Sequence, residues 1–373
     1  TIDNLLTYNK TFNRHSIDAL LGTSWMREYY RYMTNSTIND LGGTDITGFQ
    51  NEDGKISAGD SNAALLSFFA RVNYDYDNKY LLSLSIRRDE SSKFHKDNRV
   101  GYFPSVSAGW NVHQEKWFQN PVMSKLKIRA SYGELGANFL NPYNFDAIAY
   151  GPIPYTVGGE RYVTGRAAYL KSKDLKWETA KTTDIGIELG FFNNDLTLSL
   201  DYFVKKNVDL LAQIDLNLSS GQIFEINSSR EKPYVNTASV KNTGWEFMMN
   251  YRKQLTKDFH IDATFNIATL KNKVLSLGEN VQPITSGAMS SYFNDAPSIT
   301  MPGEAIGSFY GYKIDGFDAE GNFIFADMDK NGVVNANDKV ILGSPIPDFT
   351  YGLNINMEYK DFDLTLFFQG VQG

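Results

Sequence analysis

The sequence predicts an all-β protein built around one large antiparallel sheet of about twelve strands. Three observations lead to this prediction. Apolar and polar residues alternate along many segments, the connections between these segments alternate between tight turns and long loops, and aromatic residues and glycine are abundant. The chain has 373 residues, including 22 Tyr, 25 Phe and 30 Gly. Aromatic residues favour pleated strands, whereas Gly, Asn and Asp favour the turns between them.

The composition excludes several classes of protein. With 43 acidic and 36 basic side chains the formal charge is −7, and 42% of the residues are apolar. The chain is therefore neither a disordered tail nor a basic nucleic-acid binder, and no nucleic acid is expected as a partner. The absence of cysteine excludes a disulfide framework, a zinc–thiolate site and thiol catalysis. No segment approaches the roughly 18 uninterrupted apolar residues of a transmembrane helix.

Five segments carry the alternation most clearly. Within each, every second residue is apolar and the residues between are polar, which is typical of a strand with two different faces. In chain order these segments are 80–88, 196–202, 245–252, where Met248 departs from the pattern, 259–267 and 349–359. Several predicted strands are ten or more residues long, which is the length that a tilted membrane-spanning strand needs.

The connections between the predicted strands alternate between short and long. Tight hairpin turns are predicted at Asp77-Asn78, Asn193-Asn194 and Lys360-Asp361. Between them, long polar connections are expected near 33–62, 91–99, 136–180, 207–234 and 273–347. Short turns at one end and long loops at the other are typical of a transmembrane β-barrel, whose long loops are extracellular. We therefore predict part of a large antiparallel transmembrane barrel in a bacterial outer membrane, in contact with membrane lipid.

A soluble protein remains the alternative, because a β-sandwich that buries one face shows the same alternation. In that case the chain would be a secreted β-rich adhesin or carbohydrate-binding protein. The strands of a sandwich are usually only about five or six residues long, and loops of the predicted length are uncommon in compact domains. The barrel is therefore the favoured interpretation.

Four blocks of sequence resemble a known family. They are YFPSVSAGWN at 102–111 with LKIRASYG at 126–133; WET at 177–179 with TDIGIE at 183–188, DYF at 201–203 and DLL at 209–211; NTGWE at 242–246 with NKV at 272–274; and Gly311-Tyr312 with DMDKNG at 327–332 and GSPIPDF at 343–349. Together, in this order, they resemble the SusC/RagA family of TonB-dependent outer-membrane transporters of Bacteroidetes.

The resemblance implies a function and a set of partners. A family member imports a large nutrient, an oligosaccharide or a peptide, through a plugged barrel of about 22 strands. Its implied partners are a SusD-like surface lipoprotein that acts as a lid, and TonB, which contacts an N-terminal part. We expect residues 1–373 to be a partial barrel domain, an internal piece of a longer protein that lacks the plug and the last strands. Such a piece would form barrel wall and loops.

The predicted loop 273–347 contains a calcium-like motif at 327–338. Oxygen-bearing residues occupy positions 1, 3, 5, 7, 9 and 12 of the motif, with Gly332 at position 6, which is the spacing of an EF-hand-type loop. The predicted ligands are Asp327, Asp329, Asn331, the backbone carbonyl of Val333, Asn335 through water, and Asp338. The bound Ca²⁺ would be structural. The alternative, a turn rich in Asp and Asn that is ordered without metal, stays open.

Residues 136–170, within the predicted connection 136–180, concentrate aromatic residues among Gly and Pro. Tyr143, Tyr150, Tyr155 and Tyr162 are candidates for contact with a sugar ring, a peptide or the lid, and the alternative is that they hold the loop on the rim of the barrel. Catalysis has no support, because the four histidines lie far apart and the sequence has no nucleophile, phosphate-binding or dinucleotide motif. No catalytic residue is predicted, and the protein is not expected to be an enzyme.

Overall fold

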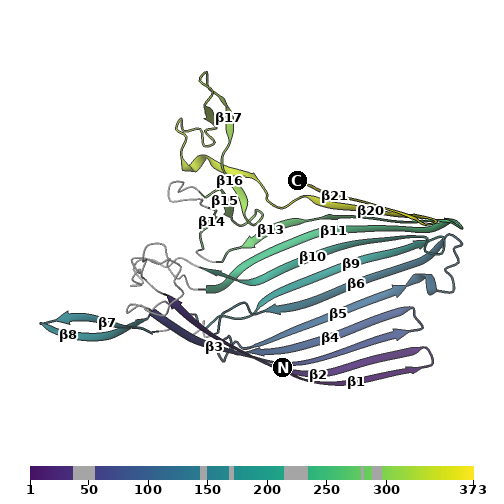
Figure 1. Ribbon diagram of the computed structural model, residues 1–373, viewed down its shortest axis with the longest axis horizontal. Coiled ribbons are helices and arrows are strands. Elements are labelled where there is room, and N and C mark those ends of the chain that lie inside the picture. The colour runs from purple at the N-terminus through teal and green to yellow at the C-terminus, as the bar shows by residue number, and fades with distance from the viewer. Residues whose placement is uncertain (37–54, 143–148, 168–171, 214–233, 279–280, 288–295) are drawn as a thin grey trace.

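The computed structural model contains one large antiparallel sheet with small loop elements at one end (Figure 1). It describes residues 1–36, 55–142, 149–167, 172–213, 234–278, 281–287 and 296–373. Twelve strands follow one another across the sheet in the order β1-β2-β3-β4-β5-β6-β9-β10-β11-β12-β20-β21, and β13 pairs with β11 beside this path. The all-β class and the expected number of strands are confirmed. Within the described residues, no helix is long and apolar enough to cross a membrane.

The strands of the first half of the sheet are β1 (Ile2–Phe12), β2 (His15–Ser36), β3 (Lys55–Tyr76), β4 (Tyr80–Ser91), β5 (Val100–Asn111) and β6 (Met123–Ala137). The strands of the second half are β9 (Glu178–Phe191), β10 (Leu196–Gln213), β11 (Tyr234–Thr256), β12 (Phe259–Thr269), β13 (Lys271–Ser276), β20 (Phe349–Tyr359) and β21 (Phe362–Gln372). Each strand pairs with the next one antiparallel, as the alternating polarity predicts.

Short turns gather at one end of the sheet and long connections at the other (Figure 1). All three predicted hairpins form, and Asp77, Asn78, Asn193, Asn194 and Lys360 adopt the positive φ that tight turns need. The predicted connections 33–62 and 207–234 are shorter than expected, because β2, β3 and β10 continue into the residues that were expected to form them. These strands are therefore longer than a strand needs to be to cross a membrane.

The register gives the sheet one apolar face and one polar face. One row of directly opposed residues across seven strands is apolar throughout: Leu126, Leu189, Leu198, Met249, Phe265, Leu353 and Phe368. The next row lies on the other face: Lys127, Glu188, Ser199, Met248, Asn266, Gly352 and Gln369. Hereafter these are called the apolar face and the polar face.

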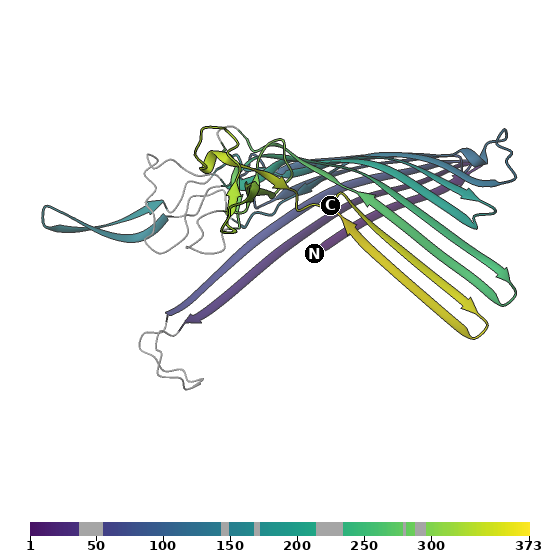
Figure 2. The same ribbon diagram turned by 90° about the horizontal axis from the view of Figure 1, so that it is seen from above.

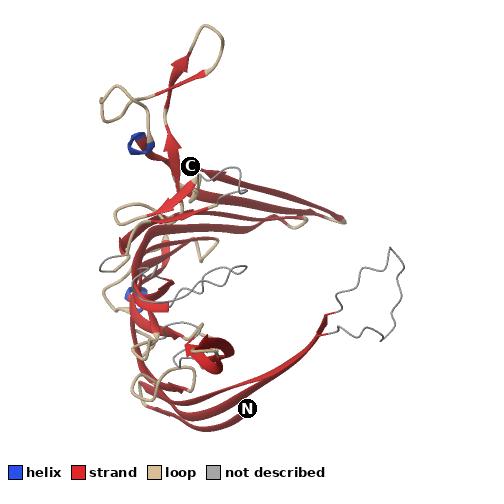
Figure 3. Ribbon diagram, turned by 90° about the vertical axis from the view of Figure 1, so that its left-hand side faces the viewer, coloured by secondary structure: helices blue, strands red, loops and turns tan. Residues whose placement is uncertain are grey.

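The sheet is strongly curved and open, as the views in Figures 2 and 3 show. Its two edges, β1 and β21, have no further strand beside them in the described residues. In the part of the chain that the structure describes, no second layer covers the apolar face, and residues on it such as Leu84, Ile185 and Phe368 are about half exposed. The buried apolar core is small and lies elsewhere, at the long-loop end.

Two buried clusters hold the long connections on the sheet. In the first, Phe103 on the polar face of β5 packs with Phe94, Leu140, Leu175 and Trp177 from three connecting segments. In the second, Ala212, Ala238, Val240, Val274 and Leu277 pack together. The connections are thus anchored by packing, and Trp177 also donates a hydrogen bond from Nε1 to the Arg99 carbonyl at 2.9 Å.

The turn between β5 and β6 is fixed by one carboxylate. It contains the short 3₁₀ helix η1 (Val112–Gln114), after which Glu115 accepts hydrogen bonds from the Tyr80 hydroxyl at 2.7 Å and Trp110 Nε1 at 3.2 Å. Lys79 Nζ lies 3.3 Å from the other carboxylate oxygen. The Tyr80 hydrogen bond, aided by Trp110 and Lys79, holds the pKa of Glu115 below its ordinary value of 4.5, against the opposing effect of burial.

This lowered pKa predicts a pH dependence. A depressed pKa in the folded state contributes stability that is present above pH 4.5 and is lost as the pH falls through the folded pKa. The unfolding temperature should therefore drop between pH 5 and more acidic values, and it should drop less in Glu115→Gln, which cannot titrate. An identical fall in both proteins would show that Glu115 does not stabilise the turn.

Candidate functional site

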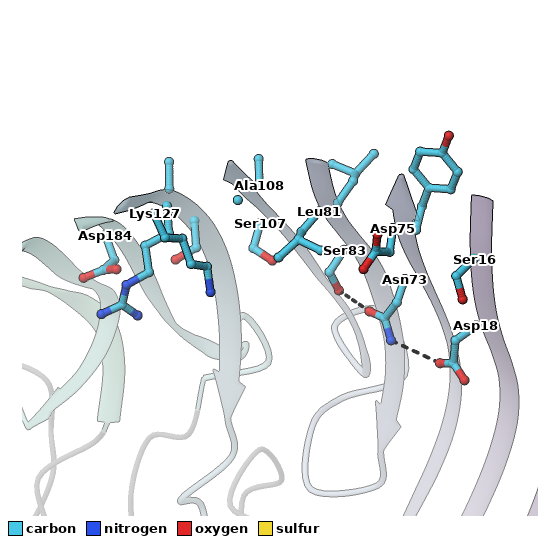
Figure 4. A pocket seen from close by; sticks show the side chains of 16 residues that line it. Ser16, Asp18, Asn73, Asp75, Leu81, Ser83, Ser107, Ala108, Lys127 and Asp184 are labelled. Carbon is cyan, nitrogen blue, oxygen red and sulfur yellow. Dashed lines mark hydrogen bonds between the residues drawn. The ribbon is translucent and has the colours of Figure 1, made fainter. Parts of the chain in front are cut away.

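A shallow depression lies on the polar face where β2 to β6 run side by side (Figure 4). Asn73 of β3 donates to Asp18 of β2 at 3.1 Å and accepts from the Ser83 hydroxyl of β4 at 2.7 Å. Lys127 and Asp184 line its other side. Because Asn73 is directly opposite Asp18 on one side and Ser83 on the other, the alternation of each strand brings these three side chains to one surface. The depression can offer both donors and acceptors to a polar ligand.

A charged network continues along the polar face beside the depression. Arg129 of β6 reaches Asp201 of β10 at 2.7 Å and lies 3.6 Å from Glu188 of β9. Lys125 also contacts Glu188, at 2.7 Å. Asp201 is buried, so this ion pair is partly shielded from water. Gly186, on the strand between the partners, makes the contact possible, since a Cβ there would lie 1.8 Å from Asp201 Oδ1.

Gly186→Ala should break the ion pair across β9. The added methyl cannot fit between Arg129 and Asp201, so the two side chains must separate, and we expect a loss of about 1–3 kcal/mol in the free energy of unfolding. Gly109→Ala is the matched control, because its nearest neighbour would be Leu81 Cδ1 at an ordinary 3.4 Å. Chemical unfolding in detergent measures both. Equal stability of the two variants would contradict the proposed role of Gly186.

The connection between β13 and β20 forms a small module of its own. One sheet contains β14 (Ile284–Ser286), β15 (Ser298–Thr300), β16 (Ser308–Tyr312) and β19 (Lys339–Gly343). Strands β17 (Ile314–Phe317) and β18 (Phe323–Phe325) form a separate hairpin. The module stands beyond the long-loop end of the sheet (Figures 1 and 3). The sequence predicted a loop here and did not predict these strands, which at three to five residues are too short to show alternation.

The motif 327–338 lies in this module, between β18 and β19. The carboxylates of Asp327, Asp329 and Asp338 come together, with ligand atoms within 4.8 Å of one another. Asp338 is fully buried and accepts backbone hydrogen bonds from Met328 at 2.8 Å and Asn335 at 2.7 Å. These hydrogen bonds hold the pKa of Asp338 below its ordinary range, and the one from the Asn335 backbone has the largest effect. The carboxylate is therefore kept charged inside the loop.

The other predicted calcium ligands are engaged in the turns of the same loop. Asn331 Oδ1 accepts from the Val333 backbone at 2.8 Å, and the Val333 carbonyl accepts from Asn335 Nδ2 at 3.1 Å. Asn335 Oδ1 accepts from the Asn337 backbone at 2.9 Å and caps the short 3₁₀ helix η3 (Ala336–Asp338). The six residues lie along one compact loop, so the structure is compatible with both interpretations of the motif. Calcium binding stays a prediction.

The predicted connection 136–180 contains a hairpin of β7 (Ala149–Val157) and β8 (Glu160–Ala167). This hairpin projects away from the sheet (Figure 1). Tyr150 and Tyr155 lie in β7, and the backbone of Tyr155 is paired with that of Tyr162 in β8. Tyr143 lies outside the described residues. The predicted ligand contact is untested. The turn Gly158-Gly159, with positive φ at both positions, is the sequence signal from which this hairpin could have been predicted.

The polar face agrees with the expected alternation, but its charged network was not predicted. Arg129, Glu188 and Asp201 come together only through the pairing of β6, β9 and β10. The one local signal is the glycine in Asp184-Ile185-Gly186, because glycine within a strand often marks a close approach of neighbouring groups.

Comparisons with known proteins identify the family. Residues 1–372 match the family model described as TonB dependent receptor-like, beta-barrel. The chain is 34% identical to TonB-dependent receptor P3 of Formosa agariphila, with 100% of the chain and 38% of the relative covered. It is 33% identical to TonB-dependent receptor SusC of Bacteroides thetaiotaomicron, with 81% of the chain and 30% of the relative covered. The chain thus spans less than two fifths of the length of these relatives.

Solved structures agree on the fold. The RagAB peptide importer in its closed-closed state matches with a TM-score of 0.78 at 22% identity, covering 99% of this chain and 40% of that one. The open-open state matches with a TM-score of 0.77 at 23% identity, with the same coverage. The apolar face of the sheet is therefore the lipid-facing outside of a barrel wall, and the polar face looks into its lumen. The chain belongs to the TonB-dependent receptor family, of the SusC/RagA type, whose barrels span the bacterial outer membrane.

Proposed function

We propose that the chain forms part of the barrel wall and the extracellular loops of a receptor that imports a large nutrient, an oligosaccharide or a peptide. The observation that carries the proposal is the polar face, which presents the depression at Asp18, Asn73 and Lys127 and the charged network around Arg129. A polar solute with many hydrogen-bonding groups suits such a wall better than an apolar one does. The RagAB peptide importer, whose fold this chain shares, supports a large polar substrate by analogy.

The proposal includes three partners. We infer that TonB supplies the energy for import, because the matching family is described as TonB dependent. A SusD-like surface lipoprotein forms the lid over the extracellular loops, among them the module of β14 to β19 and the β7–β8 hairpin that carries Tyr150, Tyr155 and Tyr162. The nutrient itself is the third. The family is one of receptors and transporters, and we propose no catalytic step for this chain.

The alternative of a soluble adhesin or carbohydrate-binding protein is wrong. The chain belongs to an outer-membrane barrel family, and within the described residues its apolar face does not pack on a second layer.

Gene deletion in the parent bacterium tests the import function. Loss of the gene should abolish growth on one class of nutrient, either oligosaccharides or peptides, while growth on the corresponding monosaccharide or amino acids is retained. Deletion of the TonB gene should reproduce this defect, because both lesions block the same energised step. Unchanged growth of the deletion strain on every oligosaccharide and peptide that supports the wild type would contradict the proposal.

We propose in addition that the loop 327–338 binds one structural calcium ion. Asp327, Asp329 and Asp338 supply carboxylate oxygens, Asn331 and the Val333 carbonyl supply neutral ones, and Asn335 acts through water. The observation in favour is the convergence of three carboxylates within 4.8 Å, which repel one another unless a cation neutralises them. Calcium ordinarily takes six to eight oxygen ligands of these kinds, and extracellular loops bind it at sub-millimolar to millimolar concentration.

Calorimetric titration of the folded chain tests calcium binding. We expect one ion to bind with an affinity in that range and Asp329→Asn to weaken it roughly tenfold, because the loop loses one of three charges. Asp318→Asn is the control, since Asp318 holds a similar turn through Asn322 at 2.7 Å but lies outside the three-carboxylate group. Absence of binding at millimolar calcium would favour the turn that is ordered without metal.

A further inference from the structure

Four lysines form an unbroken row on the apolar face near the extracellular end. The register places Lys206 of β10 directly opposite Lys181 of β9 on one side and Lys241 of β11 on the other. Lys241 is in turn opposite Lys273 of β13. Four adjacent strands thus each contribute one lysine at one level, over a width of roughly 14 Å at the usual strand spacing. Like charges directly opposite one another destabilise a sheet, so this row needs an explanation.

The row has few anionic partners in the protein. Lys181 contacts Glu134 at 3.2 Å, at the end of the row. For the other three lysines, no carboxylate within ion-pair distance occurs in the part of the chain that the structure describes. Lys206 and Lys273 are exposed, and Lys241 is half-buried. The positive charge is therefore accessible from outside the barrel.

The height of the row coincides with the edge of the membrane. Along the apolar face of β10, Leu196, Leu198, Leu200, Tyr202 and Val204 precede Lys206, which is the next residue on that face. The ten residue-to-residue steps from Leu196 to Lys206 span roughly 33 Å of strand, or about 25 Å along the membrane normal at the usual tilt. The apolar band of such barrels is about 25 Å tall. The lysines thus lie at the level of the outer-leaflet headgroups.

We propose that this row, Lys181, Lys206, Lys241 and Lys273, is a binding site for the phosphate groups of a phosphorylated glycolipid in the outer leaflet. Lysine ammonium groups bind phosphate as point charges, and at a lipid interface their attraction to anionic headgroups adds to the burial of the acyl chains against the apolar face. Bound phosphate also removes the repulsion between the lysines. The occupant is a lipid because the row lies on the outside of the barrel, above a continuous apolar surface.

The whole receptor, purified from outer membranes, is the protein for the test. The variant replaces all four lysines by glutamine. The matched control replaces four lysines at the short-turn end, Lys10, Lys116, Lys257 and Lys360, so that the change in charge is the same at the opposite edge of the membrane. A third protein carries arginine at the four sites of the row and keeps the charge.

Native mass spectrometry after addition of phosphorylated lipid A is the readout. Wild type, the arginine variant and the control should each retain the lipid, and the glutamine variant should retain at least fivefold less. Lipid A stripped of its phosphates should bind wild type as weakly as phosphorylated lipid A binds the glutamine variant. Millimolar inorganic phosphate alone should not displace the lipid, since it gains nothing from the apolar face. Equal retention by the glutamine variant, or equal binding of the dephosphorylated lipid, would overturn the proposal.

Thermal stability separates lipid binding from a general effect of the substitutions. In neutral detergent the glutamine variant should be at least as stable as wild type, because the repulsion within the row is gone. In membranes containing phosphorylated lipid A the order should reverse, because only wild type gains the ligand. A glutamine variant that is as stable as wild type under both conditions would contradict the proposal.

Discussion

Replacing Phe247 by arginine should prevent the chain from folding stably in a membrane. Phe247 lies on the apolar face of β11, opposite Leu200 and Ile267, near the middle of the apolar band, and its ring packs 6.3 Å from that of Phe265. An arginine at the membrane midplane on the lipid face of a barrel costs about 2–4 kcal/mol. The lost contact with Phe265 adds to this. Denaturant unfolding of the receptor in lipid vesicles measures the loss.

The adjacent residue supplies the control for this prediction. Met248 breaks the alternation in sequence, yet the register places it on the polar face, opposite Ser199 and Asn266, where it is 51% exposed. Met248→Arg puts the same charge into the water-filled side, so the free energy of unfolding should change by no more than about 0.5 kcal/mol. Two variants of equal stability would mean that the two faces do not meet different solvents.

Replacing Trp177 by alanine should release the loops from the barrel rim. Trp177 is 7% exposed and packs on Phe94 and Phe103, with ring centroids 5.2 Å and 5.4 Å away. Removal of a buried tryptophan costs about 3–5 kcal/mol, and this ring also donates the hydrogen bond to the Arg99 carbonyl. Because the cluster joins three connecting segments to β5, the loss should appear as local opening rather than as unfolding of the sheet.

Hydrogen exchange and limited proteolysis measure that opening. Residues 92–99 and 172–177 should exchange faster in Trp177→Ala, while the central strands β9 and β10 remain protected. Phe139→Ala is the matched control, since Phe139 lies next to Leu140 of the same cluster but is 80% exposed. Equal exchange in the two variants would show that the cluster does not anchor the loops.

The faces and turns of the sheet could be predicted because they are encoded locally. Strict alternation from Leu196 to Tyr202 determines which side chains share a face, and the turns at Asp77-Asn78 and Asn193-Asn194 carry residues that adopt positive φ readily. Membership in the barrel family follows from blocks that are likewise contiguous in sequence. These features needed no knowledge of which strands are neighbours.

The contacts across strands could not be predicted in this way. Arg129 and Asp201 meet only because β6 and β10 flank β9, and Gly186 between them is one of 30 glycines in the chain. The lysine row likewise exists only in the register of four strands. The motif 327–338 was visible from its spacing, whereas the burial of Asp338 depends on how the loop closes on its own backbone. The register between strands and the closing of the loop depend on contacts between residues that are separated in the sequence, so they could not be predicted from local patterns.

The absence of cysteine allows the most direct test of which face meets lipid. Single cysteines at positions 197, 198, 199, 200 and 202 of β10 can be placed one at a time in the whole receptor, with any cysteine outside this chain replaced by serine, and labelled with a fluorophore in lipid bilayers. Labels at 198, 200 and 202 should be quenched by a lipid-soluble quencher, and labels at 197 and 199 by a water-soluble one. This period of two is the result that the barrel-wall account predicts. Uniform quenching along the strand, or the reverse pattern, would contradict it.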